Sequence, residues 1–125
     1  MALLADIGTR LQAEGLGTRA TDIFEGFQPD SPDNCIALFE YGGEGYDLVV
    51  DTEDTRLQAR VRNLDYTSGR TKCGSLVEAL HGLSNTALTG TNYRIIRALQ
   101  SPSYLGQDAR ERHEWSVNFK IVKDR

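Results

Sequence analysis

The segment QSPSYLGQDARERHEWSVNFKI, residues 100–121, carries the clearest structural pattern in the chain. It begins as a turn-rich loop, continues through the charged segment 108–114, and ends in a run in which apolar and polar residues alternate. The two faces of this run are Trp115, Val117, Phe119 and Ile121 on one side and Ser116, Asn118 and Lys120 on the other. A period of two predicts a strand with one buried face. No catalytic signature accompanies the segment.

Other segments also have the composition of strands. Cys35–Tyr41 has apolar residues at both odd and even positions, which favours a central strand covered on both faces. Residues 56–62 alternate again, and this places Leu57, Ala59 and Val61 inward. Shorter strands are predicted at residues 21–27, 87–89 and 93–99, the last two separated by Gly90. Residues 46–54 become acidic toward their end and are interpreted as a weak strand opening into a loop.

Two segments have the periodicity of amphipathic helices. The first places Leu3, Leu4, Ile7 and Leu11 on one side and should end at Gly15. The second repeats Cys73, Leu76, Val77 and Leu80 at i, i+3, i+4 and i+7 and should stop at His81 and Gly82. Together with the strands, this order predicts an α+β fold, an antiparallel or mixed β-sheet with two main helices packed on one face. At 125 residues, one domain spanning 1–125 is expected.

Composition narrows the classes of function. A net charge of -4 and a pI near 5.1 disfavour a dedicated nucleic-acid binder. The opening residues 1–8 lack the basic start and long apolar stretch of a secretory signal, and the apolar runs are far shorter than a membrane span needs. Without an export signal, Cys35 and Cys73 are expected to be reduced, buried and unbridged.

The residues that could carry chemistry do not form a convincing site. Cys73 and His81 lie eight residues apart on one helix, about 12 Å along its axis, so they cannot share a metal ion. Gly42, Gly43 and Gly45 match no phosphate-binding loop and are interpreted as turn residues. The sequence therefore predicts a protein that is not an enzyme and has no catalytic residues, cofactor or metal. The alternatives are a small hydrolase-like enzyme using Ser75, Glu78 or His81, and a non-specific DNA-channel protein.

Five arginines are candidates for contacts between subunits. Arg56, Arg60 and Arg62 project from one face of a predicted strand, and Arg110 and Arg112 lie in the charged segment before the last predicted strand. Forked guanidinium donors suit carboxylates and phosphates. A cationic row on an acidic chain fits subunits that meet head to tail, acidic patch against basic strand, although a solvated sheet face is an equally good interpretation.

The order of segments resembles a family of phage minor capsid proteins that look like tail terminators, or tail-to-head joining proteins. The similarity spans nearly the whole chain and is carried by five short motifs: PDSPDN at 29–34, QARVR at 58–62, LHGL at 80–83, SP followed by LGQD at 101–108, and WSVNF at 115–119. The sequence departs from the family pattern in the second helix, where Gly69 and Gly74 stand in place of helix formers.

This resemblance implies architecture and partners rather than a reaction. It implies a hexameric ring that caps the tail tube and joins the tail to the head. The implied partners are further copies of the chain, the tail tube protein and the head-tail connector protein, with no sequence-specific nucleic acid and no membrane. The implied location is the head-tail junction of the virion, and the host cytoplasm during assembly.

Overall fold

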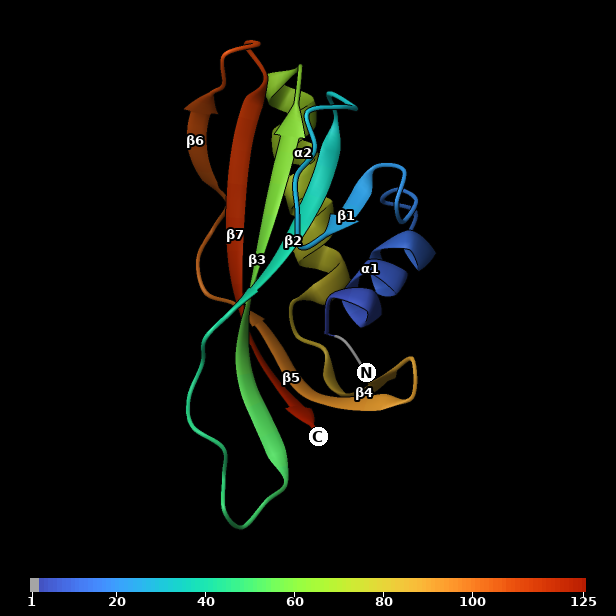
Figure 1. The fold of residues 1–125 in the computed structure, drawn as a ribbon, viewed down its shortest axis with the longest axis vertical. Helices are drawn as coiled ribbons and strands as arrows, with labels where there is room; N and C mark the ends of the chain where they lie inside the picture. Colours follow the sequence, from blue (N-terminus) through green and yellow to red (C-terminus); the bar gives the residue numbers. More distant parts are fainter. Residues whose placement is uncertain (1–2) are drawn as a thin grey trace.

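The computed structural model describes residues 3–125, which form two helices and seven strands (Figure 1). The elements, in chain order, are α1 (Leu3–Ala13), β1 (Ile23–Glu25), β2 (Cys35–Tyr41), β3 (Thr52–Asn63), α2 (Tyr66–Leu80), β4 (Ser84–Leu88), β5 (Thr91–Ala98), β6 (Ser103–Gln107) and β7 (His113–Asp124). The α+β class expected from the sequence is confirmed.

All seven strands join one curled, mixed sheet. Its order is β1-β2-β3-β7-β5-β4, with β6 also paired to β7. Only the β1–β2 pair is parallel among the described strands. The two longest strands, β3 and β7, pair along their whole length, and the other edge of β7 is shared between β5 and β6 (Figure 1). These two strands therefore run the length of the molecule and connect its two ends.

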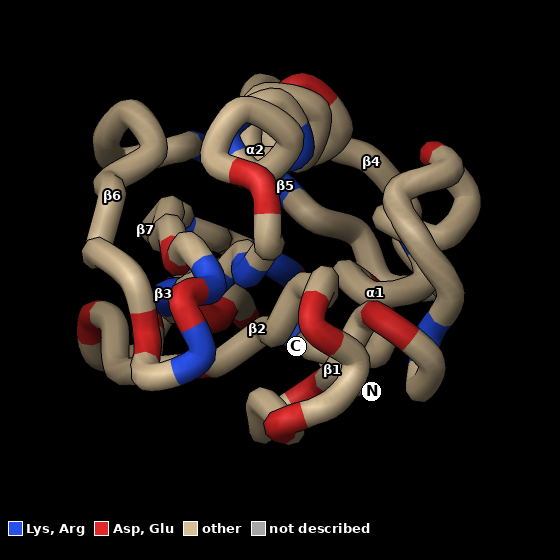
Figure 2. Tube along the Cα trace, turned by 90° about the horizontal axis from the view of Figure 1, so that it is seen from above, with Lys and Arg blue, Asp and Glu red and all other residues tan. Residues whose placement is uncertain are grey.

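Both helices pack on the same face of the sheet, as the sequence predicted. α1 lies against β1 and β2, whereas α2 lies against β3 and β7 (Figure 2). We call the helix-covered side the inner face and the opposite side the outer face. The alternation of β7 is confirmed, because Trp115, Val117, Phe119 and Ile121 are all buried on the inner face. They form one core with Leu57, Ala59 and Val61 of β3.

The second helix begins earlier than its glycines suggest. Asp65 caps it by accepting a hydrogen bond of 2.8 Å from the backbone N–H of Ser68, so Gly69 and Gly74 both lie inside the helix. Gly69 has a packing reason: a Cβ there would lie 2.9 Å from Nε1 of Trp115. The glycine therefore lets α2 approach the sheet closely, and its cost in helix propensity is offset by this contact.

Two sequence interpretations were wrong in detail. Residues 46–54 are not a strand that opens into a loop: residues 42–51 form the loop, and β3 starts only at Thr52. The stretch before β7 is not all loop, because β6 pairs there with the first half of β7. Pro102 and Gly106 give that stretch the composition of a turn, and β6 bonds to a single neighbour, so a local pattern does not reveal it.

The two cysteines are free and buried, as expected. Burial raises the pKa of both thiols, and for Cys73 the value reaches about 11. Neither thiol is therefore ionised near neutral pH, and both act as small apolar core residues.

Candidate assembly surfaces

The structure separates the five candidate arginines into buried and accessible groups. Arg62 is buried on the outer face, where its guanidinium donates to the backbone carbonyls of Pro29, Pro32 and Asp33 at 2.6, 2.7 and 3.1 Å. These carbonyls belong to the loop of residues 26–34 between β1 and β2. Arg62 therefore fixes this loop against the sheet, and its side chain has little surface left for another subunit.

Arg112 fixes the same loop from the other side. Its side chain is only 4% exposed and bonds to carboxylate oxygens of Asp30, Asp33 and Asp108 at 2.9, 3.3 and 2.8 Å. Burial of Asp108 favours its neutral form. The backbone N–H groups of Arg112 and Arg110, and then the Arg112 guanidinium, outweigh burial and hold the pKa of Asp108 below its usual value. The carboxylate therefore stays charged and keeps Arg112 in place.

The remaining three arginines are accessible to different degrees. Arg110 is 63% exposed and forms a surface ion pair of 2.9 Å with Asp30. Arg56 is partly covered and pairs with Asp54. Arg60 is half-buried, and it forms no hydrogen bond or ion pair with any residue between 3 and 125; its buried Nε is without a partner there. Of the five, Arg60 alone has no hydrogen-bond or ion-pair partner among the described residues.

Two further cations, which the sequence did not single out, extend the row on the outer face. Lys120 of β7 lies directly opposite Arg56 of β3, and Arg97 of β5 lies directly opposite Lys120. Cross-strand partners share a face, so these residues and Arg60 form what we call the cationic face. Lys120 approaches Asp54 at 3.6 Å, whereas Arg97 is exposed and unpaired within residues 3–125. Only the strand register, which the sequence does not state, brings them together.

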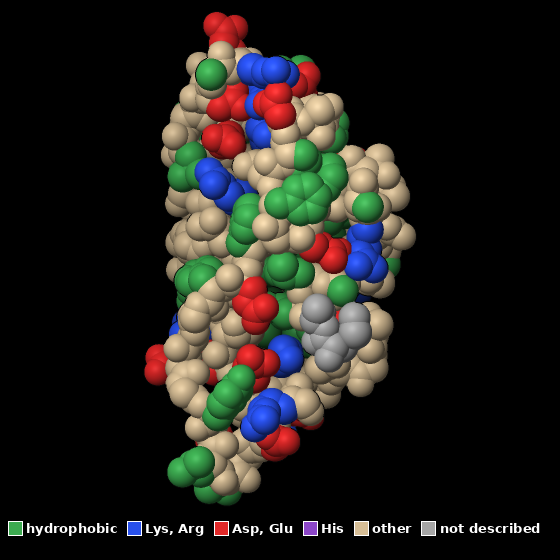
Figure 3. Space-filling model, in the orientation of Figure 1, with side chains coloured by type: hydrophobic (Ala, Val, Ile, Leu, Met, Phe, Trp, Pro, Cys, Tyr) green, Lys and Arg blue, Asp and Glu red, His purple; other side chains and the backbone are tan. Residues whose placement is uncertain are grey.

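A second surface missed by the sequence is the loop of residues 42–51, which we call the arm. It projects from one end of the molecule between β2 and β3 (Figure 1). Hydrophobic side chains gather at its tip (Figure 3): Leu48 is 100% exposed, Val49 92% and Tyr46 60%. The signal for it was the apolar run LVV between acidic residues, which is also the pattern of a short strand.

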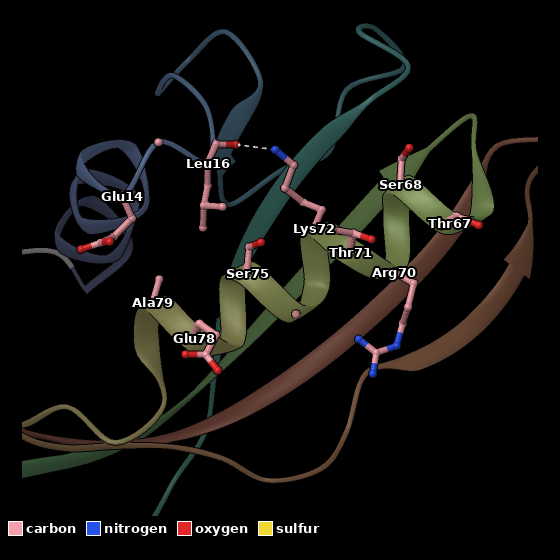
Figure 4. Close-up of a pocket in the computed structure, with 12 residues that line it drawn as sticks. Glu14, Leu16, Thr67, Ser68, Arg70, Thr71, Lys72, Ser75, Glu78 and Ala79 are labelled. Atoms are coloured by element: carbon pink, nitrogen blue, oxygen red, sulfur yellow. Dashed lines mark hydrogen bonds between the residues drawn. The ribbon is translucent and has the colours of Figure 1, made fainter.

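The three residues of the hydrolase alternative do not converge on one hollow. Ser75 and Glu78 line a shallow hollow between α2 and the end of α1, crossed by a 3.1 Å hydrogen bond from Lys72 Nζ to the carbonyl of Leu16 (Figure 4). His81 is not part of that lining. Its Nδ1 accepts a 2.9 Å hydrogen bond from the backbone N–H of Ala98, a contact that ties the end of α2 to β5. Glu78 and His81 line a different hollow beside Ala98, but Ser75 is not part of it, and within residues 3–125 Ser75 has neither of them as a hydrogen-bond partner.

Other kinds of site have no support among the residues described. Within 3–125, no three His, Cys, Asp or Glu side chains are grouped so that they could hold a metal ion. No helix in that range has the length and hydrophobicity to cross a membrane. The surfaces with unmet binding capacity are accordingly the cationic face and the arm.

Comparison with known proteins identifies the class. A family model described as bacteriophage tail terminator protein matches residues 10–125. The fold is similar to that of a chain in a structure described as the virion of a native gene transfer agent particle, with a TM-score of 0.77, 14% identity, and coverage of 99% of this chain and 96% of the other. No curated protein matches. The chain belongs to the bacteriophage tail terminator family, and it is a structural protein of the phage tail and a component of the virion.

Proposed function

We propose that copies of this chain assemble into a ring, a hexamer by family resemblance, that caps the tail tube and joins the tail to the head. The observation that carries the proposal is the family match over residues 10–125. Capping requires a surface that binds the end of the tube and stops its growth, and joining requires a second surface for the head-tail connector. Neither task requires a reactive group.

The shape and chemistry of the two ends are suited to this work. One end carries the arm with its exposed apolar tip, and the other carries the charged loops fixed by Arg62 and Arg112. A ring of identical subunits, all oriented alike, would present these unlike ends on its two rims. The two rims would then bind different partners, the tail tube protein on one side and the connector on the other.

Contact between subunits is proposed to use the accessible cations of the outer face, Arg60 above all. Reversing the charge of Arg60 would replace attraction by repulsion at every interface of the ring. Arg60→Glu should therefore convert rings to monomers in multi-angle light scattering, while its circular dichroism stays native. The matched control is Arg60→Lys, which keeps the charge and should retain assembly.

The measurement is made with tail tubes present, because weak contacts between subunits can require the tube end as a template. Wild-type protein should arrest tube growth at a defined length and appear as a ring at one end in negative-stain images. Tubes that elongate freely in the presence of wild-type protein would contradict the capping function. If Arg60→Glu capped tubes with wild-type stoichiometry, Arg60 would not lie in the interface.

A further inference from the structure

Charge is distributed unevenly along this chain. Residues 40–54, the arm with its two flanking segments, contain six of the 18 acidic residues and none of the 14 basic ones. Three of the six, Glu44, Asp47 and Asp51, lie in the arm, and the other three belong to the adjoining ends of β2 and β3. The arm itself therefore carries three carboxylates and no cation. This negative charge would complement a cationic surface on another copy of the chain.

The arm displays its apolar side chains. Asp47 Oδ1 accepts hydrogen bonds from the backbone N–H groups of Val49 and Val50 at 2.7 and 3.0 Å, and this turn directs Leu48 and Val49 into solvent. The bonds from Val50 and then Val49 hold the pKa of Asp47 below its usual value, so its carboxylate is ionised. The guanidinium of Arg125 lies 4.7 Å above the ring of Tyr46. Contiguous exposed apolar residues in a locally held loop indicate a binding surface.

The outer face of the sheet has the complementary chemistry. Arg60 and Arg97 have no acidic partner within residues 3–125, whereas Arg56 and Lys120 already share Asp54. Apolar side chains lie among these cations. Ile95 of β5 and Tyr41 of β2 are 40% and 43% exposed and sit on the same face, because Ile95 is two residues from Arg97 and Tyr41 pairs with Arg56. An acidic and apolar arm would find unpaired cations and accessible apolar groups together there.

We propose that the arm, residues 42–51, docks on the cationic face of a neighbouring copy of the chain. The contact joins two different surfaces, so it is head-to-tail and closes into a ring when the rotation between neighbours allows it. Leu48 and Val49 pack against Ile95 and Tyr41, and the arm's carboxylates face Arg60 and Arg97. The inference rests on the proposed ring and assigns the acidic side of its subunit interface.

The test places a photo-reactive amino acid at Leu48 and, as a matched control, at Leu105, an exposed leucine of β6 at the opposite end of the molecule. Each protein is mixed with an equal amount of isotope-labelled wild-type chain and with tail tubes, then irradiated. The Leu48 probe should crosslink to labelled peptides that contain Tyr41, Arg60 or Arg97, and the Leu105 probe should not. The isotope label separates contacts between copies from contacts within one chain.

A charge reversal in the receiving surface sharpens the test. Arg97→Glu in the labelled chain should lower the yield of the Leu48 crosslink by at least about tenfold, because like charges then face each other. Arg70→Glu, a reversal at an exposed position on α2, should leave the yield unchanged. A Leu48 probe that crosslinks only to the tube protein, or equal yields with the two variants, would overturn the inference.

The same samples distinguish this inference from the proposed function. If wild-type rings cap the tubes but the Leu48 probe reacts elsewhere, the arm has another partner and the capping function stands. If wild-type protein forms no ring even on tubes, the proposed function fails, and the arm inference fails with it.

Discussion

Two loops flank strand β2, and they behave in opposite ways although both are short and acidic. Residues 26–34 precede the strand and are held by Arg62 and Arg112, whose guanidinium groups bond to carbonyl and carboxylate oxygens of the loop. Residues 42–51 follow the strand, and within the described part of the chain their bonds are local or reach the C-terminal residue, through Asp51 and Tyr46 with Arg125. The first loop becomes part of the body, and the second remains available for binding.

The difference shows that acidity alone does not decide whether a loop is fixed. What decides is whether a buried cation reaches the loop's oxygen atoms, as Arg62 of β3 and Arg112 just before β7 do for residues 26–34. A buried guanidinium satisfies several acceptors at once and lowers the cost of ordering the loop. Within residues 3–125 the arm's cationic partner is Arg125, whose side chain is 51% exposed, and the apolar side chains of residues 48–50 lie outside the core. In space-filling view, charged side chains gather at the end of the molecule that holds the loop of residues 26–34, which we call the fixed end, and hydrophobic ones gather at the tip of the arm (Figure 3).

The largest effect on this comparison is expected at Trp115, which supports the fixed end. Its ring lies 4.9 Å from the rings of both Tyr66 and Tyr104. Trp115→Ala should lower the free energy of unfolding by about 3–5 kcal/mol, since truncating a buried aromatic leaves a cavity. Thermal melting followed by circular dichroism measures it, with Trp115→Phe as the milder control. A melting temperature within about two degrees of wild type would show that the aromatic cluster does not support this end.

A smaller and more local effect is expected at Arg112. Arg112→Met keeps the apolar stem but removes the guanidinium bonds to Asp30, Asp33 and Asp108, so stability should fall by about 2 kcal/mol or more. Backbone hydrogen exchange in residues 26–34 should rise toward that of the arm. Arg110→Met is the control, because its pair with Asp30 is exposed and should contribute at most about 1 kcal/mol. Unchanged exchange in the loop would mean that Arg62 alone holds it.

The smallest effect is expected in the arm itself. Leu48→Ser removes a side chain that is fully exposed, so the stability of the isolated subunit should change by less than about 0.5 kcal/mol. Chemical denaturation of the monomer provides the measurement. A loss above about 1 kcal/mol would show that Leu48 packs within its own chain, and the contrast between the two loops would disappear.

Periodic patterns predicted the parts of the fold in which one face is buried. The alternation in β3 and β7 and the helical repeat of α2 all pointed to the correct faces, because burial along regular elements leaves a regular trace in the sequence. The bounds of β2 were correct for a related reason. Apolar residues at both odd and even positions require cover on both faces: α1 packs on the inner side of β2, and Arg62 holds the loop of residues 26–34 against the outer side.

The features that the sequence did not predict depend on contacts between residues far apart in the chain. Arg62 and Arg112 were expected at the surface like most arginines, but loop oxygens about 30 and 80 residues away draw them inside. The cationic face needed the strand register to add Arg97 and Lys120 to the row. The arm was mistaken for a strand because Leu48, Val49 and Val50 have strand composition without strand burial.

The paired strands β3 and β7 also determine how the molecule responds to mechanical force. Their twelve residue pairs form an antiparallel ladder about 40 Å long, lying along the longest axis (Figure 1). Backbone hydrogen bonds in such a ladder run across the strands, so tension along that axis loads them in shear and they must break together rather than one at a time. A pull at right angles would open the same ladder sequentially. The subunit is therefore strongest in the direction that connects its two ends.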